Sequence, residues 1–328
     1  MKFNVKTLED YCNRKLLVKH GHFKYPITIW NYSAKVQYEK LWDEITLQCR
    51  CLVTDESGFV VAKTFDKFFN LEEENNIPNE PYEIYEKLDG SLISLFHYNE
   101  ELIVCSKGSF ISSQAKEARR IFNKYEVELD KLKTYCFELV APWNRIVCNY
   151  SEEQLFLLAK FDSDGNEYPI DKYKNYFPLV KKYNYLEIEK IKESIANDKE
   201  GVVVRFESGK RIKIKGKEYV RLHKIVSNLS EKLILELLIE NKSIESVLEN
   251  IPDELFDWAK KVQKKFIDKY NKILDNCKKD YKILETRKET ALYFNTKKYP
   301  KVLFSMLDQK DTNEIIWKVV EKEFQNEK

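Results

Sequence analysis

The sequence predicts an α+β protein of two domains, a β-rich domain over residues 1–226 and a helical domain over residues 227–328. The length of 328 residues exceeds that of a typical single domain. Up to about residue 225, short runs of β-branched, aromatic and aliphatic residues are separated by turns, as in strands. Beyond Val226, apolar residues recur at three- and four-residue steps, which is typical of amphipathic helices.

The strands of the first domain are predicted where β-forming residues cluster between turn residues. These runs cover residues 47–54, 57–65, 82–87, 91–98, 101–110, 134–141, 154–162, 201–208 and 211–216. One helix is predicted over residues 112–129, because Ser112 or Ser113 can cap its N-terminus. We expect this helix to lie on one side of the sheet.

Two helices are predicted in the second domain, over residues 230–241 and 252–284. The longer helix carries an apolar stripe made of Phe256, Ala259, Val262, Phe266, Tyr270 and Ile273. From Lys260 to Lys301 there are 14 Lys and Arg against 5 Asp and Glu, although the net charge of the whole chain is only +2. This basic stretch is a candidate nucleic-acid contact, and a solvated helix face is the alternative.

Composition limits the class of protein. A hydrophobic share of 43% and an aromatic share of 13% suffice for a buried core, and the absence of long apolar runs predicts no membrane span. The N-terminus lacks the apolar stretch of a secretory signal. The seven cysteines include no Cys-x-x-Cys pair, so we expect reduced thiols in a cytoplasmic protein. A metal site of Cys49 and Cys51 with two histidines is the alternative.

The segment KLDGS, residues 87–91, joins two predicted strands. It combines a cation (Lys87), an anion (Asp89), the most flexible residue (Gly90) and a hydroxyl (Ser91). Because Asp-Gly is a favourable turn pair, one interpretation is a charged hairpin tip. The other interpretation is a loop that presents a reactive lysine, and the choice depends on the rest of the chain.

Four other stretches place charged residues in or beside predicted strands. Glu138 lies within FELV, Glu200 precedes GVVV, and Lys107 lies within SKGSF. In RIKIK, alternation puts Arg211, Lys213 and Lys215 on one face and the two isoleucines on the other. Each stretch alone also fits an edge residue or a solvent-facing strand.

In this order and spacing, the stretches resemble the motifs of the covalent nucleotidyltransferases, in which the Lys-x-Asp-Gly lysine accepts the nucleotide. The flanking segments CRCLV, KFFNLEE, FELVAPWNRIV and KIKGKEYVRLH narrow the resemblance to the phage-type RNA ligase 1 family. It covers roughly residues 45–225 densely. It implies an ATP-grasp-like nucleotidyltransferase domain of antiparallel sheets with flanking helices, followed by a small all-α domain. Cys51 departs from the glycine common after the arginine, and we expect little effect because Cys is small.

The resemblance implies a three-step ligase reaction. The Lys87 amine attacks the α-phosphorus of ATP, the adenylate passes to an RNA 5′-phosphate, and an RNA 3′-hydroxyl then displaces AMP. A free lysine, with a pKa of about 10.4, is almost entirely protonated at neutral pH. We expect Lys213, Lys215, Arg50 and magnesium to lower the pKa of Lys87 and to offset the phosphate charge.

The remaining roles follow from the same resemblance. Lys213 and Lys215 would reach the α-phosphate, whereas Arg50, Lys67 and Lys107 would hold the β- and γ-phosphates or the RNA 5′-phosphate. Glu138 and Glu200 would bind Mg²⁺, or Mn²⁺ in its place, directly or through its waters.

For Glu138, contact with the ribose hydroxyls is the alternative. Gly90 would let backbone approach the nucleotide, while Asp89 and Ser91 would orient the lysine loop. Phe69 would stack on a base or serve as a buried structural residue.

We therefore expect an ATP-dependent RNA ligase that acts as a monomer in RNA repair. Its helical domain would bind RNA, such as a cleaved tRNA anticodon loop, and a polynucleotide kinase-phosphatase could prepare the RNA ends. The alternatives are a DNA ligase, a capping-type nucleotidyltransferase, a non-catalytic RNA-binding protein on the same fold, and a sensor that only adenylates itself. A five-stranded OB-fold after KIK would favour the first two, but the tail predicts helices.

Overall fold

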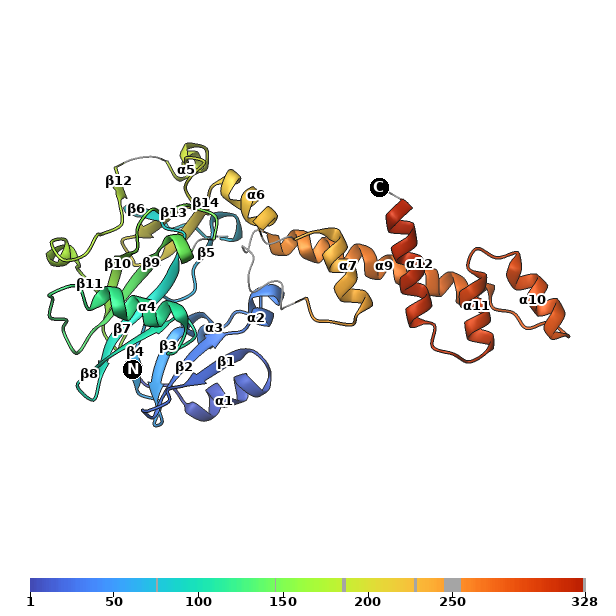
Figure 1. The fold of residues 1–328 in the computed structure, drawn as a ribbon, viewed down its shortest axis with the longest axis horizontal. Helices are drawn as coiled ribbons and strands as arrows, with labels where there is room; N and C mark the ends of the chain where they lie inside the picture. Colours follow the sequence, from blue (N-terminus) through green and yellow to red (C-terminus); the bar gives the residue numbers. More distant parts are fainter. Residues whose placement is uncertain (75, 145, 185–186, 227–228, 245–254, 327–328) are drawn as a thin grey trace. The chain divides into compact units, whose positions relative to one another are not determined.

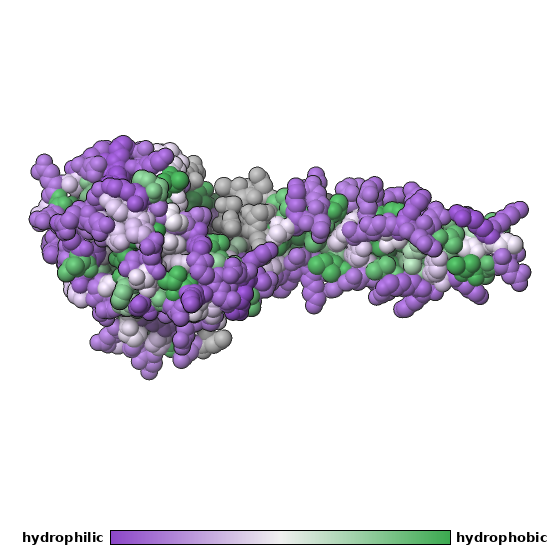
Figure 2. Space-filling view, turned by 90° about the horizontal axis from the view of Figure 1, so that it is seen from below, coloured by the Kyte–Doolittle hydropathy of each residue, from purple (hydrophilic) through white to green (hydrophobic). Residues whose placement is uncertain are grey.

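The computed structural model describes residues 1–74, 76–144, 146–184, 187–226, 229–244 and 255–326. The chain divides into two compact units, Met1–Val226 and Ser227–Lys328 (Figure 1). Hydrophilic residues cover most of the visible face of each unit, with hydrophobic residues scattered among them (Figure 2). No helix among the described residues is both long enough and apolar enough to cross a membrane.

The described residues of the first unit form three sheets, and every pairing among their named strands is antiparallel except that of β14 with β5. The first sheet has the order β1 (Leu17–Gly21), β2 (Ile27–Tyr32), β3 (Arg50–Asp55) and β4 (Val60–Ala62). The second has the order β11 (Glu167–Tyr168), β10 (Gln154–Phe161), β9 (Thr134–Val140), β7 (Ser91–Tyr98) and β8 (Glu101–Ser106). The third has the order β12 (Lys182–Tyr183), β6 (Tyr82–Lys87), β13 (Gly201–Phe206), β14 (Arg211–Lys215) and β5 (Phe69–Asn70). The predicted α+β class with antiparallel sheets is confirmed.

Helices flank these sheets. In the first unit they are α1 (Val5–Asn13), α2 (Ala34–Glu39), α3 (Glu44–Gln48), α4 (Ser113–Phe122), α5 (Ile188–Ser194) and α6 (Lys217–Val226), with single 3₁₀ turns η1 (Leu71–Glu73), η2 (Pro142–Asn144) and η3 (Asp171–Tyr173). The second unit contains α7 (Glu231–Ile239), α9 (Phe256–Asp280), α10 (Arg287–Asn295), α11 (Pro300–Leu307) and α12 (Asn313–Asn326).

Alternation along the strands separates the core from the site. On β14, Ile212 and Ile214 are fully buried, whereas Arg211, Lys213 and Lys215 are half-buried on the opposite face, as predicted. On β9 and β7, the buried side chains that pack beneath α4 form one core of the unit, and they include Ile93, Leu95, Tyr135, Phe137 and Leu139. The other face of this second sheet carries further buried apolar residues, among them Phe96, Cys105 and Cys136, together with Glu138.

The helix predicted over residues 112–129 begins as expected, because the Ser112 hydroxyl accepts a hydrogen bond from the backbone N–H of Ala115. It ends at Phe122, earlier than predicted. Tyr125, Val127 and Leu129 then pack against the core of the second sheet at every second position. A period of two belongs to extended chain, so burial of these three side chains ends the helix.

In the second unit, Ser230 caps α7 at the predicted start. The predicted stripe of α9 is buried at Phe256, Ala259, Val262, Phe266 and Ile273, while Tyr270 is half-buried. Residues 252–254 of the predicted helix lie outside the described residues, and α9 ends at Asp280 rather than residue 284.

Candidate active site

The KLDGS lysine lies at the end of β6, where the third sheet brings two lysines beside one glycine. Gly201 of β13 pairs with Lys87 of β6 on one side and with Lys215 of β14 on the other. A Cβ on Gly201 would lie 2.1 Å from the carbonyl oxygen of Ile214, so only glycine allows the strands to come this close. The residue before it, Glu200, is thereby placed between the two lysines.

Glu200 is the charged centre of the site. Its side chain is only 5% exposed, and its Oε2 accepts a hydrogen bond from Lys87 Nζ at 2.7 Å. Its Oε1 lies 3.7 Å from Lys215 Nζ. One buried carboxylate therefore faces two lysine amines, whose positive charge offsets its own.

The pKa of Lys87 moves in the direction opposite to the one expected. Burial lowers the pKa of this amine, but the carboxylates of Glu200, Glu138 and Asp89 outweigh burial and leave the pKa above its ordinary value. The expectation that the protein's own cations lower the pKa of Lys87 was wrong, because a carboxylate rather than a cation lies directly against the amine. These charges hold Lys87 as an ammonium ion.

Glu138 lies on β9, on the face of the second sheet opposite its main core. Burial raises the pKa of Glu138 to about 7, against the lowering effect of Lys87 and Arg50. Glu200 contributes to the rise, so the two carboxylates are close enough to repel each other. A pair of oxygen donors of this kind fits a hard cation such as Mg²⁺, which usually takes one or two protein carboxylates together with phosphate oxygens and water.

The described residues contain no group of three or more His, Cys, Asp and Glu that could enclose a metal ion by themselves. A metal at Glu138 and Glu200 would therefore take its other ligands from phosphates and water.

The loop after Lys87 is anchored by Asp89, which is 1% exposed. Its Oδ2 accepts hydrogen bonds from the backbone N–H groups of Val147 and Cys148, both at 2.7 Å. Its Oδ1 accepts one from the hydroxyl of Tyr219 at 2.8 Å. The Asp89 N–H donates in turn to the hydroxyl of Tyr150. Asp89 thus fixes the lysine loop to two other segments of the chain.

Gly90 and Ser91 complete the anchoring. A Cβ on Gly90 would lie 2.4 Å from the carbonyl oxygen of Leu139, so the glycine is needed for close approach to β9. This reason differs from the predicted approach to a nucleotide. Asn144 Nδ2 donates both to the Ser91 hydroxyl at 3.0 Å and to the Leu139 carbonyl at 2.9 Å. Arg145, in the NRIV segment, lies outside the described residues.

The predicted cations form two groups. Lys213 lies on the same face of β14 as Lys215, opposite Val203 and Asn70. Arg50, at the start of β3, is close enough to Glu138 to lower its pKa. Its Nη1 is buried and has no hydrogen-bond partner among the described residues. An unpaired buried guanidinium nitrogen is costly, and an anion would satisfy it.

Lys67 and Lys107 belong to the second group, which surrounds Tyr32. Lys107 Nζ lies 3.4 Å from the Tyr32 hydroxyl and 4.5 Å from the centroid of its ring. Lys67 Nζ lies 5.1 to 5.6 Å from the ring centroids of Tyr32, Trp42 and Phe69. Phe69 meets Trp42 edge to face and is half-buried. Sequence reasoning did not find Tyr32 or Trp42, because neither lies in a quoted motif.

Cys51 is conformationally unusual. Its φ angle is +57°, in the left-handed region that favours glycine, at a β-bulge against β2. Its backbone N–H donates to Asn31 Oδ1 at 2.8 Å, which stabilises the bulge. We expected Cys51 to replace glycine with little effect because its side chain is small. Side-chain size is the wrong criterion, since glycine is favoured at this position by the positive φ angle and not by a lack of space for a side chain.

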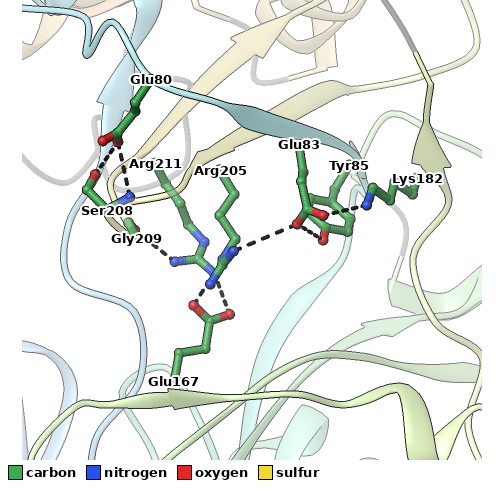
Figure 3. Close-up of polar contacts among 9 residues, drawn as sticks. All are labelled: Glu80, Glu83, Tyr85, Glu167, Lys182, Arg205, Ser208, Gly209 and Arg211. Atoms are coloured by element: carbon green, nitrogen blue, oxygen red, sulfur yellow. Dashed lines mark hydrogen bonds and ion pairs between the residues drawn. The ribbon is translucent and has the colours of Figure 1, made fainter.

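A charged network joins the second and third sheets beyond the lysines (Figure 3). Arg205 and Arg211 are directly paired across β13 and β14, so their like charges would repel. Glu167 of β11 contacts both, with Oε1 2.6 Å from Arg211 Nη2 and Oε2 3.1 Å from Arg205 Nε. Glu83 lies 3.7 Å from Arg205 Nη1 and also contacts Lys182 and Tyr85. The network ties the edge of the second sheet to the sheet that carries Lys87.

The antiparallel sheets and the loop that carries Lys87 give this protein the fold of the covalent nucleotidyltransferases. Residues 48–220 match the sequence profile of an RNA ligase family, and the chain belongs to this phage-type RNA ligase family. It is 26% identical over 301 residues to a candidate bifunctional polynucleotide kinase/RNA ligase of Autographa californica nuclear polyhedrosis virus, covering 80% of this chain and 42% of that protein. The chain thus spans less than half of the viral relative.

Other similarities are more distant. A candidate RNA ligase of Thermovibrio ammonificans is 22% identical over 266 residues, which cover 73% of this chain and 70% of that protein. Among solved structures, an archaeal ATP-dependent RNA ligase gives a TM-score of 0.47 at 11% identity over 89% of this chain and 85% of that chain. A candidate ATP-dependent DNA ligase from Aquifex aeolicus gives a TM-score of 0.47 at 16% identity, over 84% and 81%.

Proposed function

We propose that the protein is an ATP-dependent RNA ligase that joins an RNA 5′-phosphate to a 3′-hydroxyl through a lysyl-AMP on Lys87 and an RNA-adenylate. One observation carries the proposal within the family. The lysine of the Lys-Leu-Asp-Gly motif has its amine against a buried carboxylate that it shares with Lys215, and an anchored loop fixes its position. A charged hairpin tip would instead direct Lys87 into solvent.

In the first step, Lys87 Nζ forms a bond to the α-phosphorus of ATP while the bond from that phosphorus to the bridging oxygen of pyrophosphate breaks. The ammonium must first lose a proton, and Glu200 Oε2 is the acceptor already hydrogen-bonded to it. Lys213 and Lys215 offset the charge that develops on the α-phosphate. Arg50, Lys67 and Lys107 hold the β- and γ-phosphates or the RNA 5′-phosphate, and the unpaired Nη1 of Arg50 supports such a role.

Mg²⁺, or Mn²⁺ in its place, would neutralise phosphate charge when bound. Glu138 and Glu200 are the residues that would hold it, with contact of Glu138 to the ribose hydroxyls as the alternative. A cation bound there would lower the pKa of Glu138 from about 7 toward its ordinary value and so favour the ionised carboxylate.

Adenylate formation tests the proposal. With labelled ATP and magnesium, the wild type should form a covalent adenylate that stays with the denatured protein, and Lys87→Ala should form none. Lys182→Ala is the matched control, since Lys182 lies in the same sheet beside β6 and contacts Glu83 instead of Glu200. A Lys87→Ala variant that still forms the adenylate would refute the assignment.

Joining assays decide between the substrates. We propose RNA, with a cleaved tRNA anticodon loop as one candidate, bound through the basic stretch of the second unit. Several of its lysines already pair inside the unit, such as Lys265 with Glu231 and Lys269 with Glu323. If the stretch nevertheless contacts RNA phosphates, charge reversal of Lys260, Lys261, Lys264 and Lys265 should weaken RNA binding in a salt-dependent way. Unchanged affinity would remove the basic stretch from the proposal.

Sealing of 5′-phosphorylated RNA but not DNA would exclude a DNA ligase, and transfer of AMP to RNA would exclude a capping-type enzyme, a non-catalytic binding protein and a self-adenylating sensor. The viral relative carries a kinase in its name, which supports a role in RNA repair coupled to a polynucleotide kinase-phosphatase that prepares the ends. We also propose that the protein acts as a monomer and that it works in the cytoplasm. The seven free cysteines support the second of these proposals, because thiols stay reduced in that compartment.

A further inference from the structure

A small pocket outside the lysine site combines stacked rings with cations. It lies between the β1–β2 hairpin, β8 and α4 and has a volume of about 280 Å³. Its lining includes His22, Phe23, Lys24, Glu101, Phe110, Lys116 and Arg119. This volume is near the lower end for small-molecule sites, which makes it a site for a group of the size of one base.

The rings of the pocket are held in a fixed arrangement. His22 is nearly parallel to Phe23 and to Tyr25, at centroid distances of 4.5 and 5.3 Å, and Phe110 meets it edge-on at 4.7 Å. The His22 Nδ1 accepts hydrogen bonds from the backbone N–H groups of Lys24 and Tyr25, both at 3.1 Å. These two bonds fix the plane of the imidazole ring, so Phe23 lies on a rigid support.

Phe23 is 78% exposed, although its ring stacks on this support. A phenyl ring left in water contributes nothing to the core, and its open face offers a flat apolar surface. Stacking on such a surface is how proteins bind unpaired bases without reading their sequence.

The charges around the rings suit a phosphate. Lys116 and Arg119 are exposed and lie three residues apart on α4, on the same side of the helix. Glu101 is the one acidic residue in the lining, and it is already paired with Lys24. An anion near Lys116 and Arg119 would therefore meet two positive charges.

The pocket is also close along the chain to Lys107, one of the cations proposed to hold a phosphate of ATP or of the RNA end. Phe110 is three residues beyond Lys107, so their Cα atoms are at most about 11 Å apart. The turn between them is closed by a hydrogen bond from Ser106 N–H to Ser109 C=O at 2.9 Å, which shortens this distance. A ligand that places one phosphate at Lys107 can thus reach the pocket with a neighbouring unit.

We propose that this pocket binds an unpaired nucleotide of the RNA substrate, close to the end that is joined. The base stacks on Phe23, and its phosphate lies at Lys116 and Arg119. The proposal rests on the proposed RNA ligase function and deepens it, because it makes single-stranded RNA at the reacting end part of the substrate.

RNA binding by Phe23→Ala tests the proposal. Loss of one stacked base should weaken binding of 5′-phosphorylated single-stranded RNA about 5- to 100-fold, and Phe23→Trp should restore it. Phe59→Ala is the matched control, because Phe59 is an exposed phenylalanine of the same unit, 53% exposed, outside this pocket. Lys116→Gln should reduce the salt dependence of binding by about one phosphate contact.

Adenylate formation separates failure of the inference from failure of the proposed function. Phe23→Ala should still form the Lys87 adenylate at the wild-type rate, since it touches no residue of that site. If the wild type adenylates and seals RNA but Phe23→Ala binds it as tightly as Phe59→Ala does, the pocket is not an RNA site. Weaker binding of free ATP with unchanged RNA binding would identify a free-nucleotide site and also overturn the proposal, as would an equal loss for fully duplex RNA.

Discussion

Gly201→Ala is the substitution for which the structure gives the sharpest expectation. The added Cβ would lie 2.1 Å from the carbonyl oxygen of Ile214 and 2.9 Å from the Cα of Lys215. Both contacts are with backbone, which cannot rotate away as a long side chain can. Since real Cβ contacts are essentially never below 3.0 Å, β13 and β14 must separate locally by about 1 Å.

Two consequences follow from that separation. Overpacking of this kind costs about 1–3 kcal/mol of unfolding free energy. The same shift displaces Glu200 and Lys215 relative to Lys87, and a misplacement of about 1 Å in a reacting group can cost about 100-fold in rate. We therefore expect a stability loss of about 1–3 kcal/mol and a fall of about 100-fold in the single-turnover rate of adenylate formation.

Urea unfolding and single-turnover adenylation measure the two effects. Gly21→Ala is the control, because its Cβ would meet no atom within 4 Å and its φ angle is not positive. It should leave the rate unchanged and alter stability by at most about 1 kcal/mol, in the stabilising direction. A Gly201→Ala protein that adenylates within threefold of the wild type would show that the close approach of these strands does not position the site.

Two further predictions concern charged groups. Glu167→Gln leaves Arg205 and Arg211 facing each other on neighbouring strands. Because the side chains of this network are 12% to 30% exposed, the free energy of unfolding should fall by about 1–3 kcal/mol, a loss between those of exposed and buried ion pairs. Asp10→Asn is the control, because it removes the ion pair of Asp10 with Arg14, whose side chains are both more than half exposed. It should lower the free energy of unfolding by less than about 0.5 kcal/mol in the same urea titration. Equal losses in Glu167→Gln and Asp10→Asn would contradict the stabilising role of the network. For Glu138, the pKa is raised to about 7 in the folded protein by burial, so the folded state binds the extra proton and stability falls as pH rises from about 4.5 to 7. The urea midpoints at pH 5 and pH 8 should therefore differ less in Glu138→Gln than in the wild type. If the difference between the two midpoints is the same in both proteins, the pKa of Glu138 is not raised in the folded state.

Sequence reasoning succeeded where apolar residues recur along one strand or helix at the period of that element. The alternation of RIKIK predicted which face of β14 is buried, and the stripe of α9 predicted its core residues, because periods of 2.0 and 3.6 follow directly from backbone geometry. It was less accurate at boundaries, as at α4, where packing of Tyr125, Val127 and Leu129 overrides local helix preference.

The charge state of Lys87 illustrates a different limit. Sequence order suggested that cations would surround the amine, yet the strand pairing places Glu200 directly against it. Lys67 and Lys107 likewise turn out to share Tyr32, a residue from a distant strand with no motif of its own. Distances between charges depend on register, which a list of motifs does not contain.

By itself, the sequence determined the α+β class, the faces of the strands and helices, and the family to which the lysine motif belongs, since these depend on local periodicity and on residue order. Only the tertiary structure decided that Gly201 brings Lys87, Glu200 and Lys215 together, that Asp89 anchors the lysine loop to distant segments, and that an exposed ring and cations meet in a pocket outside the lysine site. These features arise from contacts between segments far apart in the chain, and such contacts are set by how the sheets pair and pack.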